Sequence, residues 1–445
     1  MKVAIAGAGI GGLCLAQGLL RAGLEVAVYE RDQALDSAGQ GYRLHIDAGP
    51  ALQACLPPDL YELCAATSGR PGTAVTVVTK GLRVLRRLEM GPPPARPAQP
   101  APPGQPAPPT SANRQTLREI LAARLDGVIE FGRACTGFEQ DAGGVTVRFS
   151  DGSSADADVL VGADGIGSPV RRRYLPHAAV EDTGIVCLYG RTPLTAQTRP
   201  LLPAPVRDGF TAVLGGGIGL AAALLDFREE PPRAARRIAP GVRLSPAGPY
   251  LMWAVTGPAR RFTGRSKPGE LAGLSHADLH ADLHAAATHA IRRWHPDLVR
   301  LVALAPAEEV SLITVRIAVP VPAWPPSRVT LLGDAIHAMS PARGSGANTA
   351  LRDAALLTEE LTAAARGAKT LVEAVGGYER QMTGYGFEAV RASRAELAGG
   401  GLRLGGVRSA VSFPRLAGWF PRRGRAAARQ ASGARRRAAR PGTAR

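Results

Sequence analysis

Glycines and an acidic residue near the start of the sequence have the spacing that a dinucleotide-binding loop requires. Gly7, Gly9 and Gly12 occur in the pattern G-x-G-x-x-G. In such a loop the first glycine permits a tight turn, the second lets a pyrophosphate approach the backbone, and the third lets helix and strand pack closely. The helix that follows would point its N-terminus at the phosphate charge. Glu30, 23 residues after Gly7, stands where an acid accepts hydrogen bonds from ribose hydroxyls.

The elements around this loop occur in the order that a Rossmann-type unit needs. Residues 2–6 are a short apolar run typical of a strand, residues 12–21 have helical periodicity, and residues 25–30 predict a second strand. A glycine-rich turn alone would carry little weight in a chain with 53 glycines. Because strand, turn, helix, strand and terminal acid follow one another, the sequence predicts a dinucleotide site rather than a merely structural turn.

Two later segments again combine a buried strand with an acid and a glycine. The first is the apolar run 159–161, which is followed by Asp164-Gly165, Ser168 and Arg171. The second is the apolar run 329–332, which is followed by Gly333-Asp334 and by a loop holding Pro341, Gly344, Gly346, Ala347 and Asn348. A carboxylate at the end of a strand can hold a sugar hydroxyl. A glycine loop that enters a helix offers backbone N–H groups to an adjacent ring.

These segments resemble the fingerprints of the class A flavoprotein monooxygenases, the para-hydroxybenzoate hydroxylase-like family. Residues 7–12 and Glu30 match its dinucleotide motif, Asp164-Gly165 matches its internal Asp-Gly motif, and residues 333–348 match its Gly-Asp motif and flavin loop. Asn113-Arg114-x-x-Leu117 resembles the family's Arg-x-x-Leu helix, whose arginine contacts FAD. The resemblance extends over residues 1–400.

The resemblance implies FAD as the bound cofactor, with Asp334 on the ribityl chain and residues 341–348 along the isoalloxazine. It also implies NAD(P)H as a transient co-substrate, because the family has no separate nicotinamide domain and this sequence shows no second G-x-G-x-x-G strand–helix unit. The implied reaction consumes O₂: a flavin C4a-hydroperoxide hydroxylates or epoxidises a small aromatic or polycyclic substrate. No catalytic base can be assigned.

Four further residues are candidates for contacts with the cofactor or the substrate. Arg31 is placed for the adenosine or phosphate end of the cofactor, and Arg43 for the flavin or NAD(P)H, with a surface salt bridge as the alternative for Arg43. Alternation along the predicted strand 185–191 puts Cys187, Tyr189 and Arg191 on one face. Tyr189 and Arg191 are substrate candidates if that face meets the flavin, and ordinary sheet packing is the alternative.

Histidines 276, 280 and 284 recur every four residues, a spacing that stacks them on one helical face and could bind a metal. The competing interpretation is an amphipathic helix whose Leu279 and Leu283 face the core. We expect no metal, because nothing supplies a fourth ligand. His337, inside the Gly-Asp motif, is expected to shape the loop rather than to act as a base.

The formal net charge of +17 is concentrated in residues 401–445, which hold twelve arginines and no Asp or Glu, so the rest of the chain carries +5. We expect a solvated tail and no specific nucleic-acid partner, with binding to nucleic acid or anionic lipid as the alternative. Five scattered cysteines without a C-x-x-C pair predict a reduced, cytoplasmic setting. No stretch is long and apolar enough to predict a membrane span.

The predicted fold class is α/β, with a Rossmann-type FAD-binding domain, a mostly antiparallel β-sheet substrate domain and a helical, basic C-terminal tail. The FAD-binding domain is predicted to be discontinuous, over residues 1–75, 110–180 and 325–400, and the substrate domain to comprise 76–90 and 181–324. Residues 91–109 are rich in proline and predict a flexible insertion, and residues 401–445 form the tail.

Other functions remain open on the same predicted scaffold. A flavin reductase or a flavin-dependent halogenase would share the cofactor, although the Trp-x-Trp-x-Ile-Pro segment usual in such halogenases is absent. A flavin-bound protein that acts on nucleic acid or a membrane through its tail is an alternative of a different class. The sequence does not indicate an oligomeric state.

Overall fold

A five-stranded parallel sheet carries the three predicted motifs. The computed structural model describes residues 1–35, 42–89, 108–263 and 276–398. The sheet has the order β17-β11-β1-β2-β7, with every neighbouring pair parallel. Its strands are β1 (Lys2–Ala6), β2 (Glu25–Glu30), β7 (Ile129–Phe131), β11 (Val159–Gly162) and β17 (Val329–Leu331). The predicted bounds of the first two strands are confirmed.

The central strands are apolar runs because both of their faces are buried, as in most parallel sheets. The strand ends are in register: Ala163 N–H donates to the Ala6 carbonyl at 2.8 Å, and Leu332 N–H donates to the Gly162 carbonyl at 2.9 Å. The loops that follow β1, β11 and β17 therefore leave the sheet side by side at its C-terminal edge. In open α/β sheets, ligands bind at this edge.

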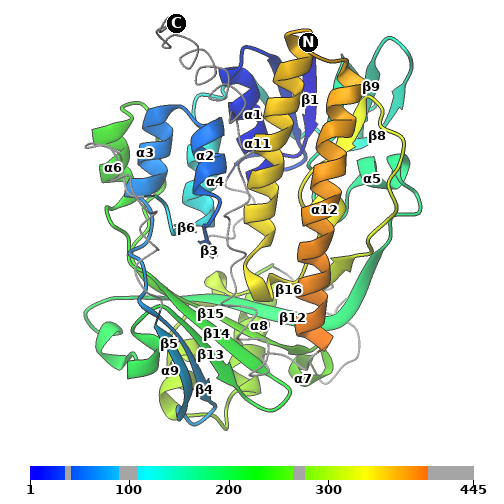
Figure 1. Ribbon diagram of the computed structural model, residues 1–445. Coiled ribbons are helices and arrows are strands. Elements are labelled where there is room, and N and C mark those ends of the chain that lie inside the picture. Colours follow the sequence, from blue (N-terminus) through cyan, green and yellow to red (C-terminus); the bar gives the residue numbers. More distant parts are fainter. Residues whose placement is uncertain (36–41, 90–107, 264–275, 399–445) are drawn as a thin grey trace, which may run out of the picture. The chain divides into compact units, whose positions relative to one another are not determined.

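Helices surround the parallel sheet. They are α1 (Ile10–Arg21), α2 (Gly49–Cys55), α3 (Pro58–Ala66), α4 (Arg114–Ala122), α5 (Pro169–Tyr174), α6 (Pro231–Ile238), α10 (Asp334–His337), α11 (Gly346–Ala365) and α12 (Leu371–Ala398). Helix α11 packs against α1, α2 and α12, and Figure 1 shows α11 and α12 running side by side. A three-stranded antiparallel sheet of β8 (Cys135–Gln140), β9 (Val145–Phe149) and β10 (Ser154–Ala157) contacts β1 and β11.

The sequence pattern predicts a helix from Ser111, but α4 begins three residues later, at Arg114. Residues Ser111–Asn113 instead form β6, which pairs antiparallel with β3 (Arg43–His45). The side chain of Asn113 accepts a hydrogen bond from Thr116 N–H at 3.0 Å, so it caps α4. The pairing with a strand seventy residues earlier in the chain is the feature that the local pattern could not reveal.

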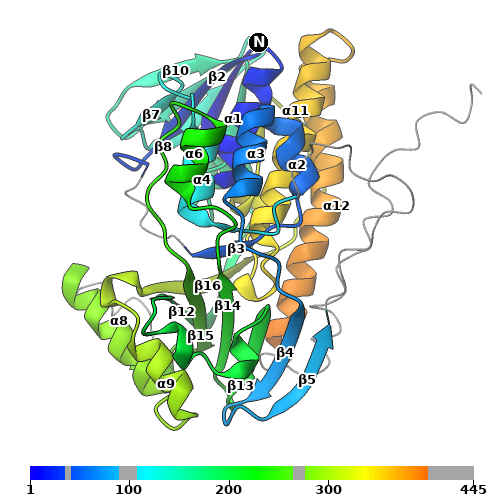
Figure 2. The same ribbon diagram turned by 90° about the vertical axis from the view of Figure 1, so that its left-hand side faces the viewer.

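The second large sheet has seven strands in the order β16-β12-β15-β14-β13-β4-β5. Its pairs are antiparallel, except for the parallel pair of β13 and β4. Its strands are β4 (Ala74–Thr79), β5 (Val84–Glu89), β12 (Val180–Pro193), β13 (Phe210–Leu214), β14 (Gly219–Leu225), β15 (Tyr250–Pro258) and β16 (Ser311–Ala318). Figure 2 shows α8 (His276–Ala290) and α9 (Pro296–Ala303) beside this sheet.

The two faces of the seven-stranded sheet have different neighbours because side chains alternate along each strand. Leu188, Trp253 and Val255 belong to a core that includes Leu283 and Ala287 of α8. On the opposite face, Cys187 and Ala254 pack with Tyr189 and Ala221. The predicted alternation of β12 is therefore confirmed, and the second face is the one that concerns the candidate site.

Five short helical segments are also present among the described residues: α7 (Arg260–Thr263) and the 3₁₀ turns Arg199–Leu201, Ala204–Val206, Ala307–Glu309 and Pro341–Arg343. Contacts divide the chain into two units, Met1–Leu402 and Arg403–Arg445. Most of the predicted insertion 91–109 and the predicted tail 401–445 lie outside the described residues. Over the described ranges, no helix is long and apolar enough to cross a membrane.

Candidate cofactor site

The turn after β1 needs glycine at two positions for packing and leaves open space at a third. Gly7 has φ +107°, and a Cβ there would lie 2.4 Å from the Ala163 carbonyl oxygen. A Cβ on Gly12 would lie 2.1 Å from the Gly7 carbonyl oxygen. A Cβ on Gly9 would meet no atom within 4 Å. Gly9 therefore borders free space at the N-terminus of α1, where a phosphate would be stabilised.

Glu30 and Arg118 fix the same loop from two sides. The Glu30 carboxylate accepts hydrogen bonds from Ala8 N–H at 2.7 Å and from Asp32 N–H at 3.1 Å. Arg118 on α4 donates through Nε to the Ala8 carbonyl at 2.9 Å, and its Nη2 lies 3.7 Å from the Glu30 carboxylate. Each carboxylate oxygen retains a second lone pair for a ribose hydroxyl. Arg118 was missed at the sequence level, although it lies one helical turn after Arg114.

Arg31 is placed differently from its neighbour Glu30. Its side chain is 75% exposed, and its nearest charged partner is Asp32, with Nε and Oδ1 3.8 Å apart. It follows the last residue of β2, so it stands at the edge of the loop without taking part in its packing.

The Asp-Gly motif presents an unsatisfied carboxylate oxygen. Asp164 Oδ1 is buried without a hydrogen-bond partner among the described residues, whereas Oδ2 accepts from Val170 N–H at 3.4 Å. Desolvation raises the pKa of Asp164 against the lowering effect of the Ser168 hydroxyl and nearby backbone N–H groups. Gly165, with φ +77°, again borders open space. A ligand hydroxyl at Oδ1 would satisfy this carboxylate.

Arg171 ties the second motif to the third. Its side chain is buried, with Nη1 donating to the Ala335 carbonyl and Nη2 to the Ile166 carbonyl, both at 2.9 Å. Ile166 belongs to the Asp-Gly loop and Ala335 to α10, so this guanidinium holds the two loops in a fixed relation.

Asp334 is the first residue of α10 and is exposed. Desolvation by the surrounding protein raises its pKa, partly opposed by the charges of His337 and Arg114. A Cβ on Gly346 would lie 3.8 Å from Asp334 Oδ1, so the carboxylate stands beside the N-terminus of α11.

The loop from Pro341 to Asn348 reaches the start of α11 in a left-handed turn at Gly344, which has φ +61°. Asn348 is buried: its Oδ1 accepts from Asp47 N–H at 2.9 Å and Ala48 N–H at 3.1 Å, while its Nδ2 donates to the His45 carbonyl at 2.9 Å. The side chain of Asn348 thus fastens another loop to α11. Because the Asn348 side chain is already bonded, this loop can offer a ligand ring only its backbone groups. They include those of Gly346 and Ala347, which are half-buried.

Arg114 is the first residue of α4. Its Nη1 atom is buried and has no hydrogen-bond partner among the described residues. The guanidinium carbon of Arg114 lies 5.6 Å from the centre of the Tyr42 ring. The backbone N–H of Arg114 donates to the Tyr42 carbonyl at 2.9 Å. Burial raises the pKa of Tyr42, and the Arg114 charge opposes that rise. Tyr42 was not singled out in the sequence, because its partners lie on distant elements.

The two substrate candidates on β12, Tyr189 and Arg191, both have side-chain partners in the structure. Tyr189 stacks on Tyr42, with ring centroids 5.4 Å apart and planes inclined by 24°. The Arg191 Nε donates to the Glu309 carboxylate at 2.6 Å, and its guanidinium lies 5.3 Å from the centre of the Tyr250 ring. Tyr189 therefore faces the nucleotide-binding half, while the charge of Arg191 is compensated by Glu309.

Arg43 does not form the surface salt bridge considered as its alternative. Its Nε donates to the Leu224 carbonyl on β14 at 3.0 Å, and desolvation lowers its pKa. No carboxylate in the described ranges lies within ion-pair distance of its guanidinium. The residue therefore bridges β3 and the seven-stranded sheet.

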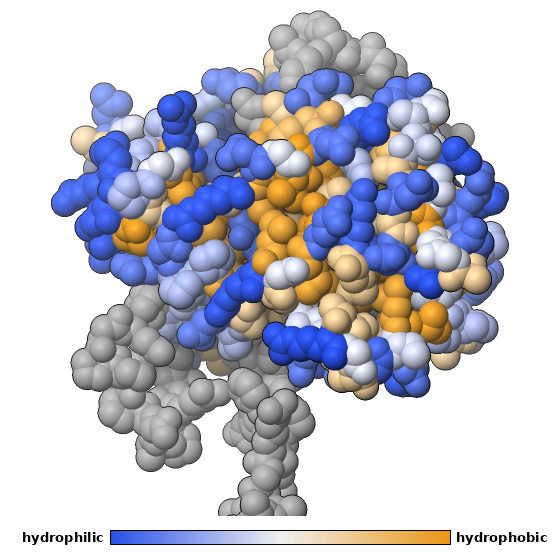
Figure 3. Space-filling view, turned by 90° about the horizontal axis from the view of Figure 1, so that it is seen from above, coloured by the Kyte–Doolittle hydropathy of each residue, from blue (hydrophilic) through white to orange (hydrophobic). Residues whose placement is uncertain are grey.

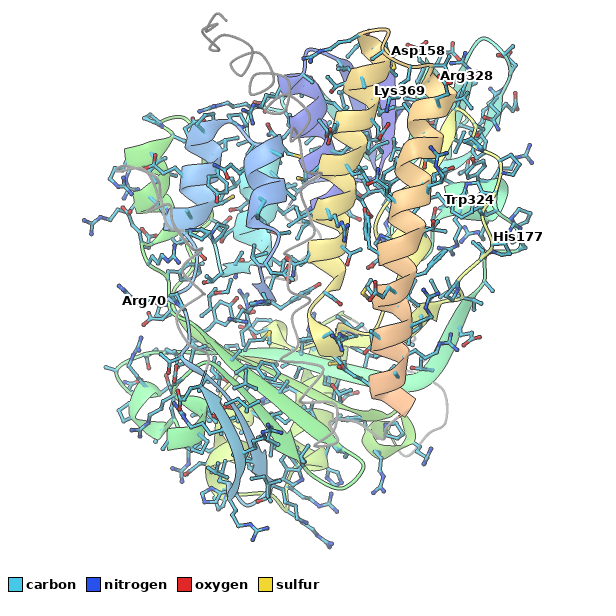
Figure 4. The ribbon with its side chains drawn as sticks, in the orientation of Figure 1. Arg70, Asp158, His177, Trp324, Arg328 and Lys369 are labelled. Carbon is cyan, nitrogen blue, oxygen red and sulfur yellow. The ribbon has the colours of Figure 1, made fainter. Side chains whose placement is uncertain are left out.

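Main-chain hydrogen bonds also join the helical half to the seven-stranded sheet close to Arg43. Gly69 and Phe227 form an antiparallel bridge, and Arg70 N–H donates to the Asp226 carbonyl at 2.8 Å. Figure 4 shows Arg70 where the helical half meets the seven-stranded sheet. These contacts set the spacing between the nucleotide-binding half and the sheet face that carries Tyr189.

Charged residues at the opposite edge of the parallel sheet have structural partners. Asp158 accepts from Lys2 N–H at 2.7 Å, and Arg328 Nη1 donates to the Asp158 carbonyl at 3.2 Å. Figure 4 shows both side chains at that edge, far from the motif loops. Seen from above in Figure 3, apolar side chains gather near the middle of this face and hydrophilic ones surround them.

Two histidines of α8, His280 and His284, bond to backbone carbonyls. His280 Nδ1 lies 2.6 Å from the Val310 carbonyl oxygen and His284 Nε2 lies 3.0 Å from that of Val302, while Leu283 is buried. The side chains of His276 and Leu279 lie outside the described set. No group of three potential metal ligands occurs among the side chains that the structure describes.

Comparisons with known proteins identify the family. A family model described as "FAD binding domain" matches residues 282–379. A crystal structure of a protein from Photorhabdus luminescens, assigned as an FAD-containing monooxygenase, is similar at a TM-score of 0.71 and 32% identity, covering 90% of this chain and 97% of that one. Klebsiella pneumoniae HpxO, solved with FAD and uric acid, shares the fold at a TM-score of 0.67 and 23% identity, covering 92% and 91%.

The fold and the three motif loops define an FAD-binding α/β protein with an attached sheet. The chain belongs to the FAD-dependent monooxygenases of the para-hydroxybenzoate hydroxylase-like class A family, and FAD is its cofactor. The dual O-methyltransferase/FAD-dependent monooxygenase CTB3 of Cercospora beticola is 34% identical over 85% of this chain. That match covers 44% of CTB3, so the chain spans less than half the length of the curated relatives it first matches.

Proposed function

We propose that this protein is an NAD(P)H- and O₂-dependent FAD monooxygenase that hydroxylates or epoxidises a planar aromatic or polycyclic molecule. One observation carries the proposal: the three motif loops meet at the C-terminal edge of the parallel sheet, and the Tyr189 face of the second sheet packs against the same region through Tyr42. A relative from Streptomyces platensis, a 3-amino-4-hydroxybenzoate 2-monooxygenase, is 29% identical over 82% of the chain. Its aromatic substrate supports the class proposed here.

The residues present fit FAD along the whole C-terminal edge. Free space at Gly9 and the N-terminus of α1 suit the pyrophosphate, with Glu30 for the ribose and the exposed Arg31 for the adenosine or phosphate end. Buried atoms without partners, Asp164 Oδ1 and Arg114 Nη1, suit polar groups of the same cofactor.

The flavin end would be held by the third motif. Asp334 is proposed to bind the ribityl chain beside Gly165, and the backbone of residues 341–348, including Gly344 and Ala347, to line the isoalloxazine. The N-terminus of α11 at Gly346 would stabilise negative charge on the reduced ring. When bound, reduced FAD supplies the O₂ activation and oxygen transfer.

The sheet face opposite these loops suits a flat substrate. Ala254 on β15 pairs with Tyr189 on β12 and, on its other side, with Ala221 on β14, so two methyl side chains follow the aromatic ring across the sheet. Ala221 is half-buried. A larger side chain at this position would extend over the sheet face that the methyl group leaves uncovered. We call Ala221 and Ala254 the alanine floor. Small side chains beside an aromatic ring favour stacking of a planar ligand.

The protein's own groups then position the substrate and exclude water rather than perform covalent chemistry. Tyr189 is proposed to contact the substrate ring. Arg191 is proposed to contact the rim of the substrate ring. Because Glu309 compensates the charge of Arg191, this arginine is less suited to binding an anion. Arg43, which lacks a carboxylate partner in the described protein, is proposed to meet the anionic part of NAD(P)H or of the flavin.

We also propose the division of the chain suggested by the sequence, with residues 1–75, 110–180 and 325–400 as the FAD-binding domain and 76–90 with 181–324 as the substrate domain. Contacts such as Arg43 with Leu224 hold the two parts together. The insertion 91–109 and the tail 401–445 are left without an assigned role.

A test combines flavin reduction with product analysis. Anaerobic stopped-flow mixing with NADPH or NADH, with phenol, 2-naphthol or anthrone present, should show substrate-accelerated bleaching of the flavin. Under ¹⁸O₂ the product should carry one labelled oxygen. Reduction that no compound accelerates, with hydrogen peroxide as the sole oxygen product, would contradict the proposal and favour a reductase. A halide-dependent product without labelled oxygen would favour a halogenase.

A further inference from the structure

A buried carboxylate behind the Gly-Asp motif has three hydrogen-bond partners, two at the ends of α10 and one on α12. Asp353 on α11 is fully buried and accepts from Gly333 N–H at 2.9 Å and from the Tyr385 hydroxyl at 2.6 Å. Its Oδ2 also lies 2.6 Å from His337 Nε2. Because a buried charge is costly unless donors surround it, these three partners are part of one arrangement.

Asp353 contacts both ends of α10. Gly333 immediately precedes Asp334, and His337 is the last residue of the helix. Asp353 thus spans the only turn of α10, while Arg171 holds the middle of that turn through the Ala335 carbonyl. The position of the Asp334 backbone is therefore determined from behind by Asp353.

Helix α12 closes the arrangement from the other side. A Cβ on Gly386 would lie 2.8 Å from His337 Cδ2, so glycine allows the helix to approach the imidazole closely. The Tyr385 ring lies under Arg352, with the guanidinium carbon 3.5 Å from the ring centre. Farther along α12, Ser393 accepts from Ser340 N–H at 3.0 Å and Glu396 pairs with Arg343 at 2.6 Å. The helix therefore braces the whole segment from α10 to the 341–343 turn.

The charges in this arrangement reach Asp334. Burial alone lowers the pKa of His337, but the charge and hydrogen bond of Asp353 and the charge of Asp334 outweigh it, and the net pKa is raised. The raised pKa favours a protonated imidazole, whose Nε2 lies 2.6 Å from Asp353 Oδ2. His337 in turn partly offsets the desolvation that raises the pKa of Asp334.

We propose that Asp353, His337 and Tyr385 are positioning residues that fix the place and charge of Asp334 and so set the affinity and the midpoint potential of the bound flavin. The inference rests on the proposed placement of the ribityl chain at Asp334. The three residues have separate tasks. Asp353 holds α10, Tyr385 supports Asp353, and His337 balances the charge of Asp353.

The test uses the full-length protein and measures FAD dissociation by titrating apoprotein, and the midpoint potential by dye equilibration, both without substrate. D353N leaves Gly333 N–H and the Tyr385 hydroxyl with a poorer acceptor, so FAD should bind at least about tenfold more weakly, equivalent to about 1.4 kcal/mol. Y385F removes one donor but keeps the ring, so it should weaken binding in the same direction and by less.

H337Q separates charge from position. The glutamine amide can still donate to Asp353, but it cannot take up the proton that the raised pKa of His337 favours, so the charge of Asp353 loses its compensation. We expect FAD affinity close to that of the unmodified protein together with a more negative midpoint potential, because nearby negative charge disfavours reduction. A purely structural role of His337 would not shift the potential while leaving the affinity unchanged.

E379Q is the matched control: Glu379 is a buried acid on the same helix, whose Oε1 accepts from the Thr330 hydroxyl at 2.8 Å on β17. The Trp324 indole lowers the pKa of the Glu379 carboxyl. Figure 4 shows Trp324 beside the upper half of α12, away from the flavin loop. This variant should leave affinity and potential unchanged.

Unchanged FAD affinity in folded D353N, or an equal loss in D353N and E379Q, would overturn the inference. If D353N does not fold, Y385F and H337Q decide, and wild-type affinity and potential in both would overturn it. These readouts are independent of turnover. A protein that hydroxylates no compound leaves the inference standing, whereas wild-type FAD affinity in D334A would remove the placement on which it rests.

Discussion

Tyr42 and Tyr189 stack across the junction between the nucleotide-binding half and the seven-stranded sheet, with ring centroids 5.4 Å apart. Tyr42 directly precedes β3 and lies beside Arg114, whereas Tyr189 lies on the sheet face with the alanine floor. The pair therefore joins the cofactor side of the site to the proposed substrate side. Burial raises the pKa of both phenols, so both remain neutral at physiological pH.

The first prediction concerns this stack. Y189A removes one ring, and because an aromatic pair contributes about 0.5–1.5 kcal/mol, the Kd for 2-naphthol should rise roughly 2- to 10-fold. Perturbation of the flavin absorbance on ligand addition measures this Kd. Y189F keeps the ring and should bind 2-naphthol as the unmodified protein does. An unchanged Kd in Y189A would place the ligand elsewhere.

The second prediction concerns the alanine floor. A221L adds a branched side chain to a half-buried position next to Ala254, one strand away from Tyr189, so three-ring ligands should lose affinity while one-ring ligands keep it. For anthrone we expect a Kd at least about tenfold higher, because overpacking typically costs about 1–3 kcal/mol. Binding of phenol and of anthrone to A221L is compared with binding to A221S, which keeps the small size. Equal effects on both ligands would show that Ala221 does not limit substrate width.

Local sequence patterns predicted the parts of the fold that depend on neighbouring residues. The bounds of β1 and β2 follow from short apolar runs, and the tight turn at Gly7 follows from a spacing that only glycine can satisfy. The alternation of Cys187, Tyr189 and Arg191 followed from strand geometry alone.

Contacts between distant elements could not be predicted in the same way. Arg118 reaches the Ala8 carbonyl across 110 residues, and nothing in its own helix distinguishes it from other arginines. Asn348 carries a motif position, but its side chain is occupied by Asp47 and the neighbouring loop. The partner of Arg191 is likewise set by the fold, because Glu309 lies outside any motif.

The third prediction separates packing from ligand contact within the glycine loop. G9A places a methyl group where no protein atom lies within 4 Å, and φ at Gly9 is −75°, which alanine adopts readily. The apoprotein should therefore unfold at an unchanged temperature while FAD affinity falls, because the methyl group occupies the approach of the pyrophosphate. G12A is the contrasting variant: its Cβ would lie 2.1 Å from the Gly7 carbonyl oxygen, so the apoprotein itself should be destabilised.

Calorimetry of the apoproteins and FAD titration distinguish these outcomes. A loss of apoprotein stability in G9A similar to that in G12A would mean that Gly9 serves packing. Unchanged FAD affinity in G9A would mean that the pyrophosphate does not pass this loop, and the proposed cofactor placement would then be wrong at its adenosine end.

The last prediction concerns pH and the buried acid Glu379. Desolvation raises its pKa to about 7, against the lowering effect of the Thr330 hydroxyl and the Trp324 indole. Since the folded pKa exceeds the unfolded value, the folded state retains its proton longer. The associated stability is fully present below the unfolded pKa and is lost as pH rises toward 7. By linkage, the loss amounts to roughly 3 kcal/mol.

E379Q should abolish this contribution, because an amide does not titrate. Urea unfolding at pH 5 and pH 8 measures the difference: relative to the variant, the unmodified protein should lose stability between these two values. The comparison cancels the other titrating groups, which both proteins share. An equal change with pH in both proteins would mean that Glu379 titrates near its ordinary value, and that the contact with Thr330 is made by a carboxylate that remains ionised in the folded state.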